Sequence, residues 1–236
     1  MEKAIAIIPA RSGSKGLKDK NILELKDKPL MVYTIEAAIN SKIFDTVHVS
    51  TDSEKYLNIA KNAGADEPFL REPENSSDSS STWDAVREVL KKYENIGKKF
   101  DYCVLLQPTS PLRTASDIKN AFELFKKNNA LSLTSVTETD HPVQWCFELE
   151  NTDFMTDFSH SLYKDCRRQE LKKHYRENGA IYIVKTKDIA DPDFDFYNER
   201  CVAYKMDKSS SIDIDDLTDF YMAQALLDSK EKKDEK

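Results

Sequence analysis

"KAIAIIPARSGSKGLKDKN", residues 3–21, joins the two patterns that decide the fold. Residues 3–10 form a nearly continuous apolar run rich in isoleucine, which is typical of a strand covered on both faces in a parallel sheet. Residues 11–21 hold two of the chain's five glycines, together with four cations and one acid: Arg11, Lys15, Lys18, Lys20 and Asp19. Because the whole chain carries a formal net charge of −7, this local positive charge predicts a site for an anion such as a phosphate chain. A solvated basic turn is the alternative.

Strands and helices alternate along the chain after this loop. The apolar patterns predict strands at 46–51, near Phe69 and Leu70, and at 102–107, 130–137 and 179–186. They predict helices at 29–42, 53–65, 81–93, 115–128 and 216–229. Such alternation predicts an α/β fold with a doubly wound, mostly parallel sheet and right-handed crossovers. Since ligands of such sheets bind beyond the carboxyl ends of the strands, we expect a site among the loops 11–21, 51–53 and 107–113.

One segment breaks the alternation. Residues 140–176 mix aromatic and charged side chains without a helical or strand period, so we expect them to leave the sheet as a small dimerisation arm. The remaining chain, residues 1–139 and 177–229, is predicted to form a single α/β domain. Residues 230–236 carry charged side chains and no apolar ones, and we expect a flexible tail there.

The stretch "SIDIDD", residues 211–216, offers carboxylates near the other end of the chain. Alternation in an extended segment places Asp213 and Asp215 on one face and the isoleucines on the other. Two carboxylates on one face can share a hard cation such as Mg²⁺ (or Mn²⁺), which prefers oxygen ligands. The alternatives are solvent-facing aspartates, or Asp215 as the N-cap of the helix that follows. A cationic phosphate loop favours the metal hypothesis, because a magnesium nucleotide requires both kinds of charge.

Two further polar stretches are candidates for ligand contacts. "QPTSPLR", residues 107–113, offers the Gln107 amide and two hydroxyls to a polyhydroxylated ligand. The alternative is an ordinary turn before a helix capped by Thr114 or Ser116. Residues 166–179 contain five cations and two glutamates, and an arginine there can pair with a carboxylate. A solvated helix face is the alternative for that stretch.

Composition argues against several classes of protein. A net charge of −7 does not suit general nucleic-acid binding, because phosphate backbones are bound by broad cationic surfaces. We expect no membrane partner, since no apolar stretch approaches the roughly 20 residues of a transmembrane helix and the start does not resemble a signal peptide. The cysteines show neither metal-ligand spacing nor a disulfide framework: Cys103, Cys146, Cys166 and Cys201. We therefore expect a cytoplasmic protein.

Seven stretches together resemble one enzyme family. They are "IIPARSGSKGLKDKN", "VSTDS", "LREPENSSDSSST", "LLQPTSPLR", "RRQEL", "RENGAIYI" and "SIDID". In order and approximate spacing they are similar to the CMP-sialic acid synthetases, or acylneuraminate cytidylyltransferases, over about residues 4–228. The resemblance implies a Rossmann-like nucleotidyltransferase fold and transfer of CMP from CTP to the anomeric hydroxyl of a sialic acid, a nine-carbon 2-keto sugar acid. It also implies release of pyrophosphate, a requirement for Mg²⁺, and a homodimer that exchanges residues 140–176.

The resemblance also implies roles for individual residues. The expected catalytic residues are Arg11, Lys20 and Asp213. The nucleotide is expected to contact Arg11, Lys15, Asn21, Arg71 and Thr82. The sugar acid is expected to contact Gln107, Asn178, Tyr182 and, from the partner subunit's arm, Arg168. Asp213 and Asp215 are the expected metal pair. In this scheme Arg11 and Lys20 hold the triphosphate and stabilise the charge that develops at the α-phosphate.

Two positions depart from the family pattern. Gln144 stands where a lysine is usual, and Glu177 where a proline is usual. A missing cation near the sugar carboxylate leaves other sugar acids as alternatives: legionaminate, pseudaminate or 3-deoxy-manno-octulosonate. A glycosyltransferase also joins a nucleotide-binding sheet to an Asp-x-Asp pair, but it would have little use for four cations in the first loop. A non-catalytic nucleotide-binding regulator on the same fold is the alternative from another class.

Overall fold

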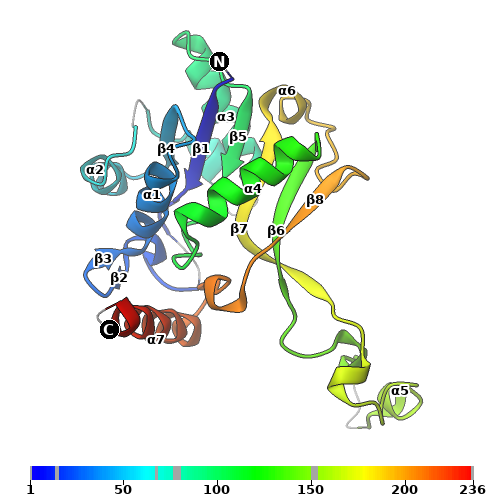
Figure 1. The fold of residues 1–236 in the computed structure, drawn as a ribbon. Helices are drawn as coiled ribbons and strands as arrows, with labels where there is room; N and C mark the ends of the chain where they lie inside the picture. Colours follow the sequence, from blue (N-terminus) through cyan, green and yellow to red (C-terminus); the bar gives the residue numbers. More distant parts are fainter. Residues whose placement is uncertain (1, 14–15, 67–68, 77–80, 150–153, 235–236) are drawn as a thin grey trace.

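The computed structural model describes residues 2–13, 16–66, 69–76, 81–149 and 154–234. Within them, six strands form one sheet in the order β4-β1-β5-β7-β6-β8 (Figure 1). The strands are β1 (Ala4–Pro9), β4 (Thr46–Ser50), β5 (Tyr102–Leu105), β6 (Ser132–Glu138), β7 (Tyr175–Lys185) and β8 (Cys201–Lys205). β7 runs antiparallel to its neighbours β5 and β6, and the other pairs are parallel. The prediction of a mostly parallel α/β sheet is confirmed.

β1 shows why the opening apolar run decides the fold. Alternate side chains point to opposite faces of a strand. Ala4, Ala6 and Ile8 accordingly pack in one hydrophobic cluster, and Ile5 and Ile7 pack in another. All five are buried. Because both faces of the strand are covered, it has no polar face, and its apolar pattern is continuous rather than alternating.

Helices cover both faces of the sheet, as a doubly wound fold requires. The longer ones are α1 (Leu30–Ser41), α2 (Glu54–Asn62), α3 (Thr82–Asn95), α4 (Ala115–Lys127) and α7 (Leu217–Asp234), and the short ones are α5 (Thr156–Ser159) and α6 (Thr186–Ile189). α1 and α4 pack Met31, Ile35 and Phe125 into the first cluster, whereas α3 packs Val86 and Val89 into the second. None of the helices in the described ranges has the length and apolar character needed to cross a membrane.

A third cluster joins the hairpin after the first loop to the aspartate segment and the last helix. The short hairpin of β2 (Glu24–Leu25) and β3 (Lys28–Pro29) follows the first loop. Its Leu25 packs with Ile214 and with Phe220 of α7, and Figure 1 shows α7 beside this hairpin. Burial of Ile214 therefore fixes the aspartate segment against the first loop.

The expected strand near Phe69 is wrong. Residues 69 and 70 form no strand, although an isolated bridge pairs His48 with Asp66 just before them. The Phe69 ring instead packs against the rings of His48 and Tyr93, with centroid distances of 5.0 and 5.1 Å. Its apolar character therefore serves the core rather than a strand ladder.

The arm, residues 140–176, leaves the sheet between β6 and β7 and projects away from the body of the molecule (Figure 1). Its last two residues already belong to β7. Besides α5, the described part of the arm holds two 3-10 turns, Val143–Trp145 and Arg168–Glu170. Large apolar side chains are exposed on it: Leu149, Phe154, Leu162 and Tyr163. Such a concentration of exposed apolar side chains on a projecting segment is typical of an interaction surface.

Candidate functional site

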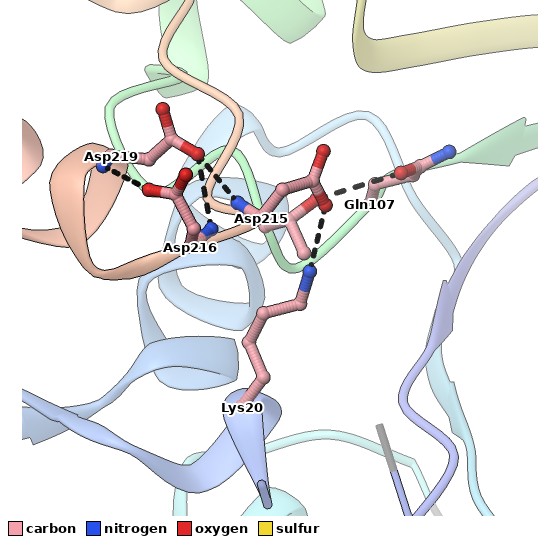
Figure 2. Close-up of polar contacts among 6 residues, drawn as sticks. Lys20, Gln107, Asp215, Asp216 and Asp219 are labelled. Carbon is pink, nitrogen blue, oxygen red and sulfur yellow. Dashed lines mark hydrogen bonds and ion pairs between the residues drawn. The ribbon is translucent and has the colours of Figure 1, made fainter. Parts of the chain in front are cut away.

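A segment from the early part of the sequence and one from its late part meet beside the carboxyl end of β1. Lys20, in the loop that follows β1, places its ammonium nitrogen 3.0 Å from a carboxylate oxygen of Asp215 (Figure 2). The Lys20 side chain is 13% exposed and that of Asp215 is 78% exposed. A largely buried lysine thus forms an ion pair with a carboxylate that faces solvent. The cationic loop and the aspartate segment, which we expected in one site, are brought together.

The first loop and the aspartate segment also touch through their backbones. A Cβ atom at Gly16 would lie 2.8 Å from the Asp215 carbonyl oxygen, and the backbone would have to shift to accommodate it. Glycine at this position therefore permits the close approach of the two segments. Its meaning was not visible in the sequence, where it resembled any glycine of a phosphate loop.

Asp213 lies in a more enclosed place than Asp215. Gly179 has a positive φ of 71° and lies so close that a Cβ there would be 3.1 Å from Asp213 Oδ2 and 3.5 Å from Gln107 Oε1. Burial raises the pKa of Asp213 above its ordinary value, against the lowering effect of the Thr109 hydroxyl, and the Asp215 charge adds to the rise. Asp213 Oδ1 is buried without a hydrogen-bond partner among the described residues. The site thus holds one orphaned carboxylate oxygen.

The neighbouring aspartates cap α7. Asp216 Oδ1 accepts hydrogen bonds from the amides of Thr218 and Asp219 at 2.7 and 3.1 Å. Asp219 Oδ2 accepts in return from the amides of Asp215 and Asp216 at 2.9 and 3.1 Å (Figure 2). The alternative in which Asp215 is the N-cap is therefore wrong. Capping by Asp216 leaves the Asp215 side chain to Lys20.

The carboxylate pair suits a single hard cation. The described residues contain no group of three or more His, Cys, Asp or Glu side chains arranged to hold a metal ion. Mg²⁺, however, is commonly held by one or two carboxylates while waters and substrate phosphates complete its shell. Asp213, with its orphaned Oδ1, and the exposed Asp215 offer two such ligands. The expected Mg²⁺ (or Mn²⁺) site is chemically consistent with these donors and stays a prediction.

A second group of cations lies where β4 ends. Arg71 donates from Nε and Nη2 to the hydroxyl and carbonyl oxygens of Ser50 at 2.9 and 2.8 Å. Burial lowers the pKa of Arg71, and the nearby charge of Arg11 adds to this, whereas Asp52 opposes it. The Asp52 carboxylate in turn accepts from the Ser12 amide and hydroxyl, each at 2.7 Å. The charges of Arg11 and Arg71 are therefore close enough to interact beside the first loop. The contact between Ser12 and Asp52 was not predicted from the sequence.

Three other residues were expected to contact the nucleotide: Asn21, Thr82 and Lys15. Asn21 is buried and donates to the Arg11 carbonyl oxygen at 3.1 Å, so its side chain shapes the first loop. Thr82 is exposed in the first turn of α3, next to the capping residue Ser81. Lys15 lies outside the described residues. Their contacts with a nucleotide stay predictions.

Gln107 lies beside Asp213, and Tyr182 is near enough for the Asp213 charge to act on it. Tyr182 lies on β7 opposite Leu105 of β5, and its ring packs against Trp83 with 6.2 Å between centroids. Burial raises the pKa of the Tyr182 hydroxyl, and the Asp213 charge contributes to the rise. Together with the Gln107 amide, this hydroxyl gives the region around Asp213 polar groups suited to a polyhydroxylated ligand.

Asn178 has an internal role. It is 1% exposed. Its Oδ1 accepts from the Ser135 hydroxyl at 2.6 Å and from the Ala180 amide at 3.3 Å, and its Nδ2 donates to the Ser211 hydroxyl at 2.9 Å. Asn178 therefore ties β7 to the start of the aspartate segment, and a direct contact with the sugar acid stays a prediction.

Arg168 is not brought to this site within its own chain. It lies on the arm and lines a cleft of about 380 Å³ with Glu138, Lys172 and His174. Figure 1 shows the arm pointing away from α7 and from the β2–β3 hairpin. Within one chain, therefore, this cation does not approach Asp213.

Known proteins with similar sequences include several cytidylyltransferases. A family model described as cytidylyltransferase matches residues 5–233. An N-acylneuraminate cytidylyltransferase from Escherichia coli O18:K1:H7 is 40% identical over 232 residues, which are 98% of this chain and 53% of that protein. A pseudaminic acid cytidylyltransferase from Campylobacter jejuni is 34% identical over 224 residues, which are 95% of this chain and 96% of that protein. The chain thus spans about half the length of the N-acylneuraminate cytidylyltransferases it matches.

Solved structures show the same fold. A CMP:2-keto-3-deoxy-manno-octonic acid synthetase complexed with CTP superimposes with a TM-score of 0.71 at 18% identity, over 97% of this chain and 100% of that chain. The family match includes both the cationic loop after β1 and the aspartate segment before α7. On the evidence of the family model and of relatives aligned over nearly all its residues, the chain belongs to the cytidylyltransferase family.

Proposed function

We propose that this chain transfers CMP from CTP to the anomeric hydroxyl of a sialic acid and releases pyrophosphate. The observation that carries the proposal is the meeting of Lys20 with Asp215, beside Asp213, at the carboxyl end of β1. A magnesium nucleotide requires cations for its phosphates and carboxylates for its metal at one place, and this site offers both. Family membership supports CTP as the nucleotide.

The reaction depends mainly on how the substrates are positioned and on the charges that surround the phosphates. The hydroxyl oxygen of the sugar acid forms a bond to the α-phosphorus, the bond from that phosphorus to the pyrophosphate oxygen breaks, and the hydroxyl proton passes to a base. Arg11 and Lys20 hold the triphosphate and offset the charge that develops on it. Asp213 and Asp215 would hold the Mg²⁺, which would lower the pKa of the sugar hydroxyl when bound.

The sugar acid would lie over Asp213. The Gln107 amide lies beside that carboxylate, Tyr182 is close enough to feel its charge, and the missing Cβ of Gly179 leaves room beside it. We propose that the partner subunit's arm supplies Arg168, whose guanidinium would pair with the carboxylate of the sugar acid. The exposed apolar side chains of the arm support a homodimer.

Other sugar acids are the main alternatives. A pseudaminic acid cytidylyltransferase aligns over nearly its whole length, and Gln144 stands where a cation is usual. Activation of pseudaminate, legionaminate or 3-deoxy-manno-octulosonate would use the same nucleotide half of the site. A reaction with a soluble nucleotide and the four free cysteines support a cytoplasmic setting.

A pyrophosphate-release assay tests the proposal. Each of the four nucleoside triphosphates is paired with each sugar acid, with and without Mg²⁺. We expect turnover with CTP and N-acetylneuraminate only when Mg²⁺ is present. Faster turnover of another sugar acid would replace the substrate and keep the reaction, whereas CTP binding without pyrophosphate release would identify a non-catalytic regulator.

A further inference from the structure

Arg113 is a buried cation beside the site for which family resemblance assigned no role. It ends the loop of residues 107–113 and precedes Thr114, which forms a capping box with Asp117 at the start of α4. Arg113 is 2% exposed. Its Nη1 donates to the Gln107 carbonyl oxygen at 3.0 Å and to the Ala180 carbonyl oxygen at 2.9 Å. One nitrogen therefore links the loop after β5 to the middle of β7.

This burial is costly for the fold. A guanidinium loses its hydration when it is buried, and a paired carboxylate normally compensates for that loss. Burial lowers the pKa of Arg113 to about 9, although the Asp117 charge opposes this, and the group still carries its charge at neutral pH. Its Nε and Nη2 and the nearby Ser110 hydroxyl have no hydrogen-bond partner among the described residues. Unsatisfied buried donors call for a reason other than stability.

The two carbonyl groups belong to the two segments that enclose Asp213. Gly179 directly precedes Ala180. The position that a Cβ of Gly179 would occupy lies 3.1 Å from Asp213 Oδ2 and 3.5 Å from Gln107 Oε1, so Gln107 and Gly179 both border Asp213. The β6–β7 ladder is interrupted here, because its register shifts between Thr134 and Val136. The β5–β7 ladder ends at the pair Leu105–Tyr182, so Gln107 and Ala180 lie beyond its last pair, and the Arg113 guanidinium joins them there.

We propose that Arg113 is a positioning residue for the sugar-acid half of the site: its guanidinium holds Gln107 and Gly179 at the separation that places the sugar hydroxyl over Asp213. The inference rests on the proposed function and deepens it. Arg113 is fully enclosed, so it acts through these two segments and does not touch the substrate. The phosphate-binding cations of the nucleotide half, in the first loop and at Arg71, follow β1 and β4, whereas this link joins the loop after β5 to β7.

The test compares Arg113→Met, Arg113→Lys and the matched control Arg87→Met. Arg87 also donates to a backbone carbonyl oxygen, that of Ile189 at 2.9 Å, but it lies on α3 away from the described site. Both methionine variants lose a guanidinium-to-carbonyl link. We measure CTP affinity by calorimetry, kcat and KM for the sugar acid, the melting temperature, and hydrogen exchange of the amides around residues 107–113 and 178–181.

We expect Arg113→Met to lower kcat/KM for the sugar acid by about 100-fold, as a small misplacement of reacting groups does. CTP affinity should stay within about twofold, and Arg113→Lys should recover part of the loss, because an ammonium can still donate to both carbonyl groups. Arg87→Met should keep the wild-type kinetic constants.

Equal losses for CTP and sugar acid, or unchanged kinetics in Arg113→Met, would overturn the inference. Should Arg113→Met fail to fold, Arg113→Lys decides: loss confined to the sugar acid supports the role, and wild-type kinetics sink it. A wild-type protein that turns over no sugar acid defeats the proposed function instead. In that event the positioning role is judged by hydrogen exchange alone, and it fails if the amides of 107–113 and 178–181 exchange no faster in Arg113→Met than in Arg87→Met.

Discussion

Lys20 and Asp215 form an ion pair 3.0 Å long although 195 positions separate them in the chain. Gly16 explains how the backbones come so close, since a side chain there would meet the Asp215 carbonyl oxygen. The burial of Ile214 explains why the aspartate segment stays in place. The close approach of the first loop and the aspartate segment therefore places two opposite charges together: a lysine suited to phosphate and a carboxylate suited to a divalent cation.

Replacing Lys20 with alanine should lower kcat far more than it raises KM for CTP. The lysine is expected to act on charge that appears in the transition state, and loss of one such donor typically costs about 100-fold to 1,000-fold in kcat. Steady-state kinetics with varied CTP measure the split. Lys18→Ala, an exposed cation of the same loop, is the control and should leave kcat nearly unchanged. An effect of Lys20→Ala on KM alone contradicts the assignment.

Asp213→Asn should abolish Mg²⁺-dependent turnover and weaken the binding of Mn²⁺ by the CTP complex. The amide keeps the shape of the side chain but removes the negative charge that a hard cation prefers. Asp216→Asn is the matched control, because asparagine caps a helix about as well as aspartate does. Paramagnetic titration of Mn²⁺ gives a readout apart from activity. Identical Mn²⁺ affinities in the two variants would remove Asp213 from the metal site.

Gly179→Ala should impair turnover more than its effect on stability accounts for. The new Cβ would lie 3.1 Å from Asp213 Oδ2, so the carboxylate or the strand must move. Gly97→Ala is the control, since Gly97 also has a positive φ, of 80°, but nothing lies within 4 Å of its Cβ position. Each variant should lose about 1–2 kcal/mol in urea unfolding, and only Gly179→Ala should lose activity. Equal activities would show that the space beside Asp213 is not used.

How much the sequence predicts differs between parts of this site. The strand β1 and the loop after it were predictable, because a two-faced apolar run and a cluster of cations are local patterns. β8 was missed, since Val202 and Tyr204 are only partly buried at the edge of the sheet and show weak alternation. The roles of Gly179 and Arg113 could not be predicted from the sequence, for a different reason. Their roles depend on contacts between β7 and the loop after β5, which no local pattern reveals.

Mixing two inactive variants should restore activity if the arm completes the partner's site. Lys20→Ala and Arg168→Ala should each be inactive alone. In a mixed dimer, however, one of the two sites would contain an intact Lys20 together with the partner subunit's Arg168. Random exchange should therefore restore about a quarter of the wild-type activity. Sedimentation of the mixture establishes that dimers form and exchange. Dimers that exchange without any recovery of activity would place Arg168 outside the partner's site.

His48 should make the fold sensitive to acid. The imidazole is 1% exposed, beside Phe69 and Tyr93, and burial lowers its pKa to about 3, with Arg71 and Lys92 adding to the effect. The unfolded chain binds a proton near pH 6.5 and the folded chain does not, so stability is complete above pH 6.5 and falls as the pH drops toward about 3.

The expected slope from this one group is about 1.4 kcal/mol per pH unit within that window. Urea unfolding of the wild type and of His48→Asn at pH 7, 6 and 5 measures it. The variant should lose less stability on acidification, even if it is less stable at pH 7 because asparagine fills the core less well. His141→Asn, which alters an exposed histidine, should follow the wild-type slope. Parallel curves for the wild type and His48→Asn would show that His48 does not carry the acid sensitivity.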